Sequence, residues 1–538
     1  MQITRPLAAF ISAAILFSAG PAAAQFALGP LDDQGNGPTP PFYDPLLRQS
    51  TGDLKEHLPP GAPLWLVIPR IGGSVEFTDN VNDAQAGQGR VADVVTTISP
   101  GIYIGGDSPR FTANLDYDPE IQRYFAAPDL NHINQNLFFE SVARLKPDDS
   151  LDFDTSGAAF QSSRDGSFGG LPTNDLTANN RVASYAVEAS PVARNHFNSV
   201  GDNELRYTVG ETWFRGNTGI YDTGVTGTGT GTGTNITAAI GDATYQDLRE
   251  TLNSGANGKF VSNSLTLDGQ QTNVTNGAGS NRQTLASDEI QLHLLSNFAL
   301  VGSGGWQTID YENPQVSNLN GPAWYGGFVY QPNQDSQLTL NYGRREGSNT
   351  LLGDLHYSIT PLTDLYAGYS QSVTTPQQMI LGNLNNAVLG PNGTTLSVST
   401  GLPLYLNNNE LSLQNDLSRV QNFTSSLVTQ LATDRFSLSV NHEELTSLTG
   451  LAPGDQYTGV SASWNRALNE LDGLYVLTSY YSRDFDHRRS FYNLVSFSHQ
   501  FSSDLFGDVS YSFTYSDAQN PNINYFRDSL IFSLRKVF

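Results

Sequence analysis

The sequence predicts an all-β protein, a transmembrane antiparallel up-and-down β-barrel of about 22 strands, within a range of roughly 18–22. Three observations predict this fold. Runs of about 10–14 residues alternate apolar with polar side chains, as strands with one apolar and one wet face do. Short and long connections take turns along the chain. Only 15% of the residues are charged, against about 25% in soluble proteins, so uncharged polar residues supply most of the polarity.

The composition excludes several classes of protein. The 538 residues include no cysteine, which excludes disulfides, thiolate metal sites and cysteine nucleophiles. A mean hydropathy of −0.32 is too polar for a bundle of membrane helices. The net charge of −24 argues against nucleic acid as a partner.

The first 24 residues are expected to be a secretory signal peptide. Arg5 is followed by an apolar run from Leu7 to Phe17, and three alanines, Ala22–Ala24, precede Gln25. The apolar run is too short for the ~20 residues that span a bilayer. The mature chain is therefore expected to be exported.

Residues 25–65 are rich in Pro and Gly and are expected to form a periplasmic or lumen-entering segment. A short helix is possible between Leu46 and Leu58. This segment is too small for a folded plug domain, which argues against an energised TonB-type receptor. The barrel is expected to occupy residues 66–538.

Strand alternation is clear at many points between Leu66 and Phe538. In Phe111–Tyr117 the residues Phe, Ala, Leu and Tyr alternate with Thr, Asn and Asp, and Phe436–Asn441 follows the same rule. In Leu505–Ser516 the aromatic residues are expected to face lipid and the hydroxyls the lumen. Each such run is predicted to be one membrane-spanning strand.

The connections favour a barrel over a β-sandwich or a propeller. Tight turns such as Gly106–Pro109 and Thr360–Thr363 alternate with long connections, which are Ser162–Asn180, Asn217–Asp242, Val373–Asp416 and Thr446–Gln456. Outer-membrane barrels have short periplasmic turns and long external loops, so both termini are expected in the periplasm. The Gly-Thr tract within Asn217–Asp242 is expected to be a flexible external loop. The weakest strand signals are Thr244–Leu252 and Asn263–Gln271, which follow it.

The last strand is expected to close the barrel by pairing with the first, in the region of Val67–Phe77. Its lipid-facing residues resemble the C-terminal insertion signal of bacterial outer-membrane proteins, in which a terminal Phe follows alternating hydrophobic positions. The matching residues are Leu530, Phe532, Leu534 and Phe538. Lys536 departs from that pattern, and at the membrane rim its amine is expected to reach the headgroups.

Two stretches near the start of the predicted barrel carry a second resemblance. They are "PRIGGSVEFTDNV" (Pro69–Val81) and "ADVVTTISPGIYIGGDSPRFTANLDYDPEIQRYF" (Ala92–Phe125). The T-D-N-V, S-P-G-I and L-D-Y elements are similar to the opening of outer-membrane β-barrels associated with the PEP-CTERM/exosortase sorting system. The resemblance covers about sixty residues and implies an envelope location and a link to surface-polysaccharide export.

Charged residues on the inward positions of the predicted strands are expected to line a pore. The candidates are Glu76, Asp116, Glu140, Arg144, Asp508 and Arg535. Opposed acids and bases across a pore create a transverse field that selects by charge. Because acids outnumber bases, a mild preference for cations is expected.

No catalytic, cofactor-binding or metal-ligating residue is predicted. The eight histidines show no metal-ligand spacing. The "GDS" of Gly106–Ser108 lies in a predicted turn rather than a strand-to-helix elbow. The acid pairs Asp116/Asp118, Asp152/Asp154 and Asp484/Asp486 each share one strand face, which would suit a glycosidase or a Ca²⁺ site. Lumen lining or a solvated loop is the simpler interpretation.

We therefore expect a porin-like channel in the outer membrane of a Gram-negative bacterium. It would pass polar solutes or an exported polysaccharide by passive diffusion, with occlusion by residues 25–64, by the Val373–Asp416 connection or by a partner protein. The alternative is a structural or adhesive barrel whose external loops bind glycans or partner proteins. An outer-leaflet enzyme would need a Ser/His/acid set that the sequence does not supply. The expected partners are outer-membrane lipid and lipopolysaccharide, the barrel-assembly machinery through the C-terminal strand, and periplasmic export components.

Overall fold

The computed structural model describes residues 65–84, 89–148, 150–163, 181–197, 201–216, 240–254, 260–275, 280–312, 316, 319–389, 395–397, 416–450, 454–484, 487–517 and 524–538. The predicted signal peptide, the segment 25–64 and the Gly-Thr tract lie outside these residues. Their predictions remain untested. No helix among the described residues is both long and apolar enough to cross a membrane.

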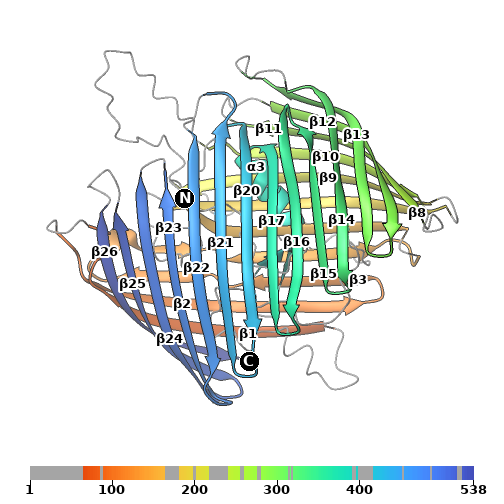
Figure 1. Cartoon of the computed structure of the whole chain (residues 1–538). Helices are drawn as coiled ribbons and strands as arrows, with labels where there is room; N and C mark the ends of the chain where they lie inside the picture. The colour runs from red at the N-terminus through yellow and green to blue at the C-terminus, as the bar shows by residue number, and fades with distance from the viewer. Residues whose placement is uncertain are drawn as a thin grey trace, which may run out of the picture.

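A closed antiparallel barrel of 22 strand positions forms the wall, which confirms the predicted fold class and count (Figure 1). The first half comprises β1 (Trp65–Thr78), β2 (Asp93–Ser108), β3 (Phe111–Tyr117), β4 (Glu120–Tyr124), β5 (His132–Asn134), β6 (Leu137–Arg144), β7 (Leu151–Ser163), β8 (Arg181–His196), β9 (Gly201–Gly216), β10 (Ala243–Ser254), β11 (Val261–Val274) and β12 (Ser280–Leu295). The second half comprises β13 (Phe298–Tyr311), β14 (Gly321–Asn333), β15 (Ser336–Arg345), β16 (Ser348–Thr360), β17 (Thr363–Thr374), β20 (Ser418–Gln430), β21 (Asp434–Ser447), β22 (Asp455–Ala467), β23 (Asp472–Arg483), β24 (Arg488–Ser502), β25 (Leu505–Asp517) and β26 (Tyr525–Val537).

The remaining elements lie in connections. A 3-10 helix, η2 (Pro128–Leu130), lies between β4 and β5. The helix α3 (Pro376–Asn385) and the two-stranded ladder β18 (Ala387–Leu389) and β19 (Thr395–Ser397) lie between β17 and β20.

Two wall positions are each built from two strand segments. β3 and β4 both pair with β2, while β6 pairs with β3 and β5 pairs with β4. The first break falls at Asp118 and Pro119, and proline has no backbone N–H for the ladder. The second break, at Gln135 and Asn136, lies beside the first. The 24 strand segments of the sheet therefore fill 22 positions.

The barrel closes where the sequence predicts. β1 pairs with β26 from Arg70↔Val537 to Thr78↔Ser529, in the expected Val67–Phe77 region. The Phe538 backbone N–H also donates to the Pro69 carbonyl, at 2.9 Å. In a bilayer an open edge would leave backbone groups without partners, so closure is what allows the sheet to exist there.

The outer surface of the closing strands is apolar, as the alternation predicts. In β26 the side chains of Leu530, Phe532 and Leu534 are 39%, 45% and 55% exposed, whereas the neighbouring Ser529 of the same strand is buried. The same rule holds in β25, where the exposed side chains are Val509, Tyr511 and Tyr515 and the buried ones are Ser510, Thr514 and Ser516. The inner surface is polar, so water and hydrocarbon are separated by one layer of strands.

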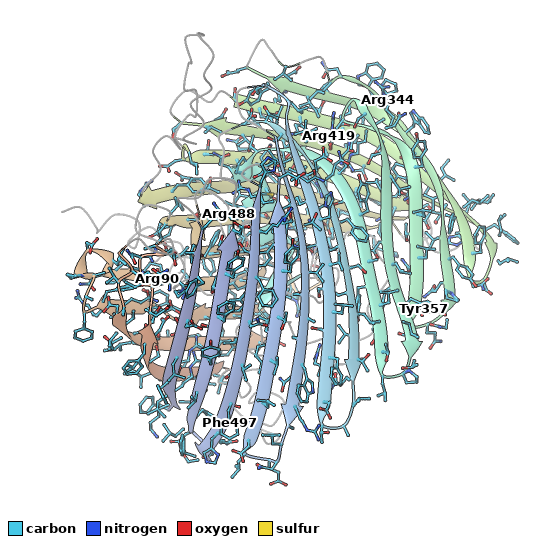
Figure 2. The ribbon with its side chains drawn as sticks, turned by 60° about the vertical axis from the view of Figure 1, so that its left-hand side comes forward. Arg90, Arg344, Tyr357, Arg419, Arg488 and Phe497 are labelled. Carbon is cyan, nitrogen blue, oxygen red and sulfur yellow. The ribbon has the colours of Figure 1, made fainter. Side chains whose placement is uncertain are left out.

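Stacked pairs of aromatic rings mark one end of the wall. The ring pairs there are Trp65–Phe111, Phe298–Phe328 and Phe436–Trp464, with centroids 5.5, 5.8 and 6.1 Å apart. Tyr357 and Phe497 lie at this same, lower end in Figure 2, while Arg344, Arg419 and Arg488 lie toward the other end. An aromatic girdle at a membrane interface is typical of outer-membrane barrels. The C-terminus lies at the girdled end (Figure 1).

Most short connections also lie at the girdled end, which is therefore the periplasmic end. Two details correct the sequence-based expectation. β2 continues through Ser108, so the turn predicted at Gly106–Pro109 is instead Pro109-Arg110. Short connections also occur at the external end: β15 and β16 are joined there by Glu346 and Gly347, whose φ angles of +54° and +75° suit a tight hairpin turn.

Candidate functional site in the barrel lumen

A short helix enters the lumen from the long connection predicted at Val373–Asp416. α3 begins with a capping box: the Gln378 N–H donates to Thr375 Oγ1, at 3.3 Å, and the Thr375 N–H donates to Gln378 Oε1, at 3.1 Å. Pro376 occupies the first turn, where no N–H is needed. A ten-residue helix is marginal alone, so its stability must come from packing.

The apolar face of α3 packs on the inner surface of the opposite wall. Ile380, Leu381 and Leu384 are at most 1% exposed. They form one apolar cluster with side chains of β6, β7, β8 and β9, which are Phe138, Ala158, Val182, Ala186 and Phe214. Counted from β1 around the 22 positions of the closed sheet, β8 is the sixth and β17 the fifteenth, so they lie on opposite sides of the barrel. The chain that leads from β17 into α3 therefore crosses the lumen.

Small wall residues make room for the helix. Ala158 and Ala186 are fully buried beneath it. A side chain at Gly210 of β9 would place its Cβ 3.2 Å from Leu381 Cδ2, tighter than an ordinary contact. The wall is thus shaped to accept α3 at this point.

Polar side chains anchor α3 at both of its ends. The Asn385 amide donates to Glu188 Oε2 of β8, at 2.9 Å, and Glu188 Oε1 accepts from Ser156, at 2.8 Å. At the other end the Gln377 amide donates to the Gly241 carbonyl, and the Asn281 amide donates to Gln378 Oε1, both at 3.1 Å. Both ends of the helix are therefore held to the wall by hydrogen bonds.

A charged cluster crosses the seam between the first and last strands. Arg70 of β1 pairs with Asp116 of β3, with Nη1 and Oδ2 3.1 Å apart, and its Nη2 lies 3.3 Å from Asp118 Oδ2. Arg535 of β26 donates to the same Asp118 oxygen, at 3.1 Å. A Cβ at Gly101 would lie 2.6 Å from Arg70 Nε, so glycine there makes room for the guanidinium.

A second charged cluster lines β7, β8 and β9. Arg194 lies 2.5 Å from Asp152 Oδ2 and 2.8 Å from Glu204 Oε2. Arg206 Nη2 lies 2.8 Å from Asp154 Oδ2. The pairs Asp116/Asp118 and Asp152/Asp154 therefore hold arginines on the lumen wall, which is the simpler of the two interpretations drawn from the sequence. Asp484 lies in the external β23–β24 connection, and Asp486 lies outside the described residues.

The other predicted pore-lining residues also occupy inward positions. Glu76 is buried. Glu140 accepts from the Asn114 amide at 2.9 Å, and Asp508 accepts from the Ser496 hydroxyl at 2.6 Å. Arg144 differs, because it lies at the periplasmic rim and donates to the Pro109 carbonyl, at 3.2 Å. Their role as pore-lining residues remains a prediction.

Sequence reasoning named Arg535, which pairs with Asp118, but missed three other arginines that pair with the predicted acids and missed the lumen position of α3. Arg70, Arg194 and Arg206 lie on inward strand positions, and the alternation of apolar and polar residues could have identified them as inward. The sequence Thr375–Gln378 is a capping signature that predicts a helix start. Neither signal identifies the wall that receives the side chain.

Within the described part of the chain, Ser108 and His499 take part in structural contacts. No group of three or more His, Asp or Glu side chains there is placed to hold a metal ion. Ser108 of the "GDS" sequence exchanges hydrogen bonds with the Phe111 backbone, at 2.9 and 3.0 Å, across the β2–β3 turn. His499 contacts Asp472, at 2.7 Å, near the periplasmic rim.

Asp83 is a carboxyl group at the external mouth with a raised pKa. Asp83, in the β1–β2 connection, lies 3.1 Å from Arg527 Nη1. Burial raises the pKa of Asp83 to about 6, although the neighbouring arginines Arg527 and Arg488 oppose that rise. This group therefore changes charge in a mildly acidic range.

Comparisons with known proteins address the fold. No protein-family model and no curated protein matches the sequence. The FrpB iron transporter from Neisseria meningitidis (F3-3 variant) matches the structure with a TM-score of 0.51 and 10% identity, over 90% of this chain and 83% of that chain. The apoprotein form of the F5-1 variant of FrpB from the same species matches with a TM-score of 0.50 and 10% identity, over 91% of this chain and 83% of that chain. The siderophore receptor PirA from Acinetobacter baumannii matches with a TM-score of 0.47 and 8% identity, over 88% of this chain and 80% of that chain.

This chain is a Gram-negative outer-membrane β-barrel. At such low identity the likeness to FrpB concerns the fold and not the transported substance. The barrel and its location confirm the corresponding predictions from sequence.

Proposed function

We propose that this outer-membrane β-barrel passes polar solutes by passive diffusion through a lumen that α3 narrows near the external mouth. The observation that carries the proposal is the crossing of the lumen by α3, which is held against β7–β9 by an apolar cluster and by hydrogen bonds. A segment that crosses a pore divides its cross-section and sets its effective width.

Dimensions favour a partly open lumen. A barrel of 22 strands, spaced ~4.8 Å apart and tilted ~40°, has a backbone diameter of roughly 40 Å. A helix with its side chains is about 10–12 Å across. α3 alone is therefore too narrow to fill the barrel.

The wall chemistry suits polar, uncharged or weakly cationic solutes. The inward acids Asp116, Asp152 and Asp154 are each paired with an arginine, so the wall presents alternating charge rather than one strong sign. The acidic excess of the whole chain biases the pore toward cations. The resemblance of Pro69–Phe125 to PEP-CTERM-associated barrels supports an exported polysaccharide as a second class of solute, and the fold shared with an iron transporter supports transport in general.

Conductance of the purified, refolded barrel in planar bilayers tests this proposal. We expect discrete open-channel steps, with reversal potentials in a salt gradient that show a mild cation preference. Liposome swelling in neutral sugars of increasing size should show a sharp size limit. A silent bilayer together with no swelling would instead support a structural or adhesive barrel.

A further inference from the structure

A polar pair lies on the outer surface of the barrel, in the middle of the wall. The Asn263 amide of β11 donates to Asp288 Oδ1 of β12, at 2.5 Å. Asp288 is the ninth of the sixteen residues of β12, so it lies near the middle of that strand.

The strand register shows that Asp288 points outward. It shares its face of the sheet with Ile290 and Leu292, which are 48% and 39% exposed. Across the β12–β13 ladder these three residues lie opposite Gly304, Gly302 and Leu300. The alternate residues of the same strands face the lumen, where Gln283 and Val301 are buried.

A carboxylate at this depth is poorly suited to hydrocarbon. Ionisable groups inside a membrane are costly and are normally paired or shielded by protein. The Asn263 amide supplies one hydrogen to Asp288 and retains a second Nδ2 hydrogen, and the carboxylate has a second oxygen. Lipid tails would satisfy neither group.

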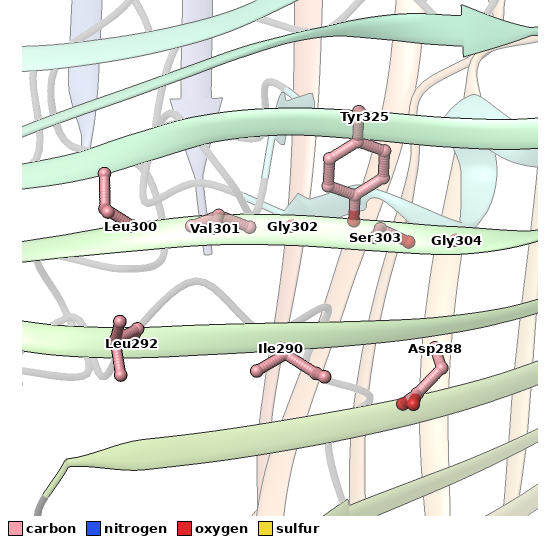
Figure 3. A pocket seen from close by; sticks show the side chains of 9 residues that line it. All are labelled: Asp288, Ile290, Leu292, Leu300, Val301, Gly302, Ser303, Gly304 and Tyr325. Carbon is pink, nitrogen blue, oxygen red and sulfur yellow. The ribbon is translucent and has the colours of Figure 1, made fainter.

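A hollow lies beside Asp288, and Figure 3 shows the side chains that line it. It has a volume of about 600 Å³, and Ile290, Leu292 and Leu300 line it together with Gly302 and Gly304. A Cβ built on either glycine would meet nothing within 4 Å, so the wall is thin and open there. The hollow is flanked by protruding aromatic side chains, since Trp306 and Trp324 are 58% and 45% exposed.

We propose that a second copy of this chain docks on this surface of β11–β14, side by side in the membrane. Two copies inserted in the same direction present the same residues at the same height. A two-fold axis along the membrane normal, passing between Asn263 and Asp288, places each amide opposite the partner's carboxylate. The four groups then close a ring of hydrogen bonds, and both carboxylates leave the hydrocarbon.

The surface is self-complementary in shape as well as in hydrogen bonding. The Gly302–Gly304 hollow accepts protruding side chains, and Trp306 and Trp324 beside it supply them to the facing copy. A lipid acyl chain would fill the hollow but would leave Asp288 in contact with hydrocarbon. The polar pair therefore favours a protein partner, and the presence of both a donor and an acceptor in that pair favours an identical one.

Disulfide cross-linking tests the proposal directly, because the chain contains no cysteine. Ile290 pairs with Asn263 in the β11–β12 ladder and so lies beside the proposed axis. We expect Ile290→Cys to form a disulfide-linked dimer in native outer membranes under mild oxidation. Val509→Cys is the matched control, since Val509 is similarly exposed, at 42%, on β25, the strand position farthest from β12.

Sedimentation in mild detergent provides a second readout. We expect the wild-type chain to sediment as a dimer and the double variant Asn263→Leu/Asp288→Leu to sediment as a folded monomer, with its barrel shown by the heat-dependent shift in gel mobility. A wild-type monomer, equal cross-linking of both cysteine variants, or a cross-linked product heavier or lighter than two copies would overturn the proposal. None of these readouts depends on conductance, so the transport proposal is tested separately.

Discussion

Arg70 illustrates how single residues use charge inside this barrel. Its guanidinium is buried between Asp116 and Asp118, and Arg535 shares Asp118 from the last strand. The cluster joins β1, β3 and β26, so it holds the seam where the chain ends meet. Buried charges of this kind are tolerated only while they are paired.

Removing Arg70 is expected to destabilise the barrel strongly. Arg70→Met leaves the buried carboxylate of Asp116 without its main partner, which typically costs about 3–5 kcal/mol. Arg466→Met is a suitable control, because Arg466 is half exposed and its nearest contact with Asp434 is 3.4 Å long, so about 1 kcal/mol or less is expected. Urea unfolding of the refolded variants measures both. Equal effects would show that the seam cluster has no special role.

A pH dependence is expected at Asp83. Its pKa in the folded chain is raised to about 6 from an ordinary value of 3.8, so folding favours the protonated form. The resulting stabilisation is complete below about pH 4 and is lost as the pH rises through about 6.

The variant Asp83→Asn isolates this group, since Asn also tolerates the φ of +49° found at that position. We expect the wild-type chain to gain stability relative to Asp83→Asn as the pH falls from 7 to 4. Thermal unfolding of both proteins at matched pH values checks this. A constant difference across that range would contradict the expected titration.

Among the secondary-structure elements, α3 forms because of residues close to it in the sequence but takes its position because of distant ones. The capping box of Thr375 and Gln378 starts the helix locally. Its position in the lumen depends instead on Ala158, Ala186 and Gly210, which lie more than 160 residues earlier in the chain. Sequence analysis therefore named the Val373–Asp416 connection as one of three candidate occluding elements but could not choose among them.

Releasing α3 from the wall is expected to widen the pore. Leu381→Ser/Leu384→Ser removes two side chains that are at most 1% exposed from the apolar cluster, a loss of about 2 kcal/mol or more for each. We expect single-channel conductance to rise severalfold and the sugar size limit to increase. Gly382→Ala is the control, because its Cβ would meet nothing within 4 Å. Unchanged conductance in the double variant would show that α3 does not narrow the pathway.

The whole molecule depends on closure between the two ends of the chain. β26 supplies the outward residues Leu530, Phe532 and Leu534, and Phe538 follows them, with a side chain 68% exposed. Because the Phe538 ring is so exposed, it contributes little to the stability of the finished barrel. Its predicted role as part of the insertion signal concerns assembly.

We expect Phe538→Ala to reduce the amount of barrel in the outer membrane severalfold while leaving the unfolding free energy of the refolded protein within about 1 kcal/mol of wild type. Phe501→Ala is the matched control, since Phe501 is 59% exposed near the same rim. Quantitative blotting of outer-membrane fractions and urea unfolding give the two readouts. Equal reductions for both variants would remove Phe538 from the insertion signal.

Alternation with a period of two is a local property, so the residues alone were enough to predict an outer-membrane barrel, its 22 strands, the lipid-facing Leu530–Phe538 pattern and the inward positions of Asp116 and Asp508. The partners of those residues were not predictable in this way. Arg70 reaches Asp116 across 46 residues, and Asn385 reaches Glu188 across 197. Such contacts depend on the shear of the closed sheet and on the shape of the opposite wall, so only the tertiary structure decided where α3 docks and which charges are paired.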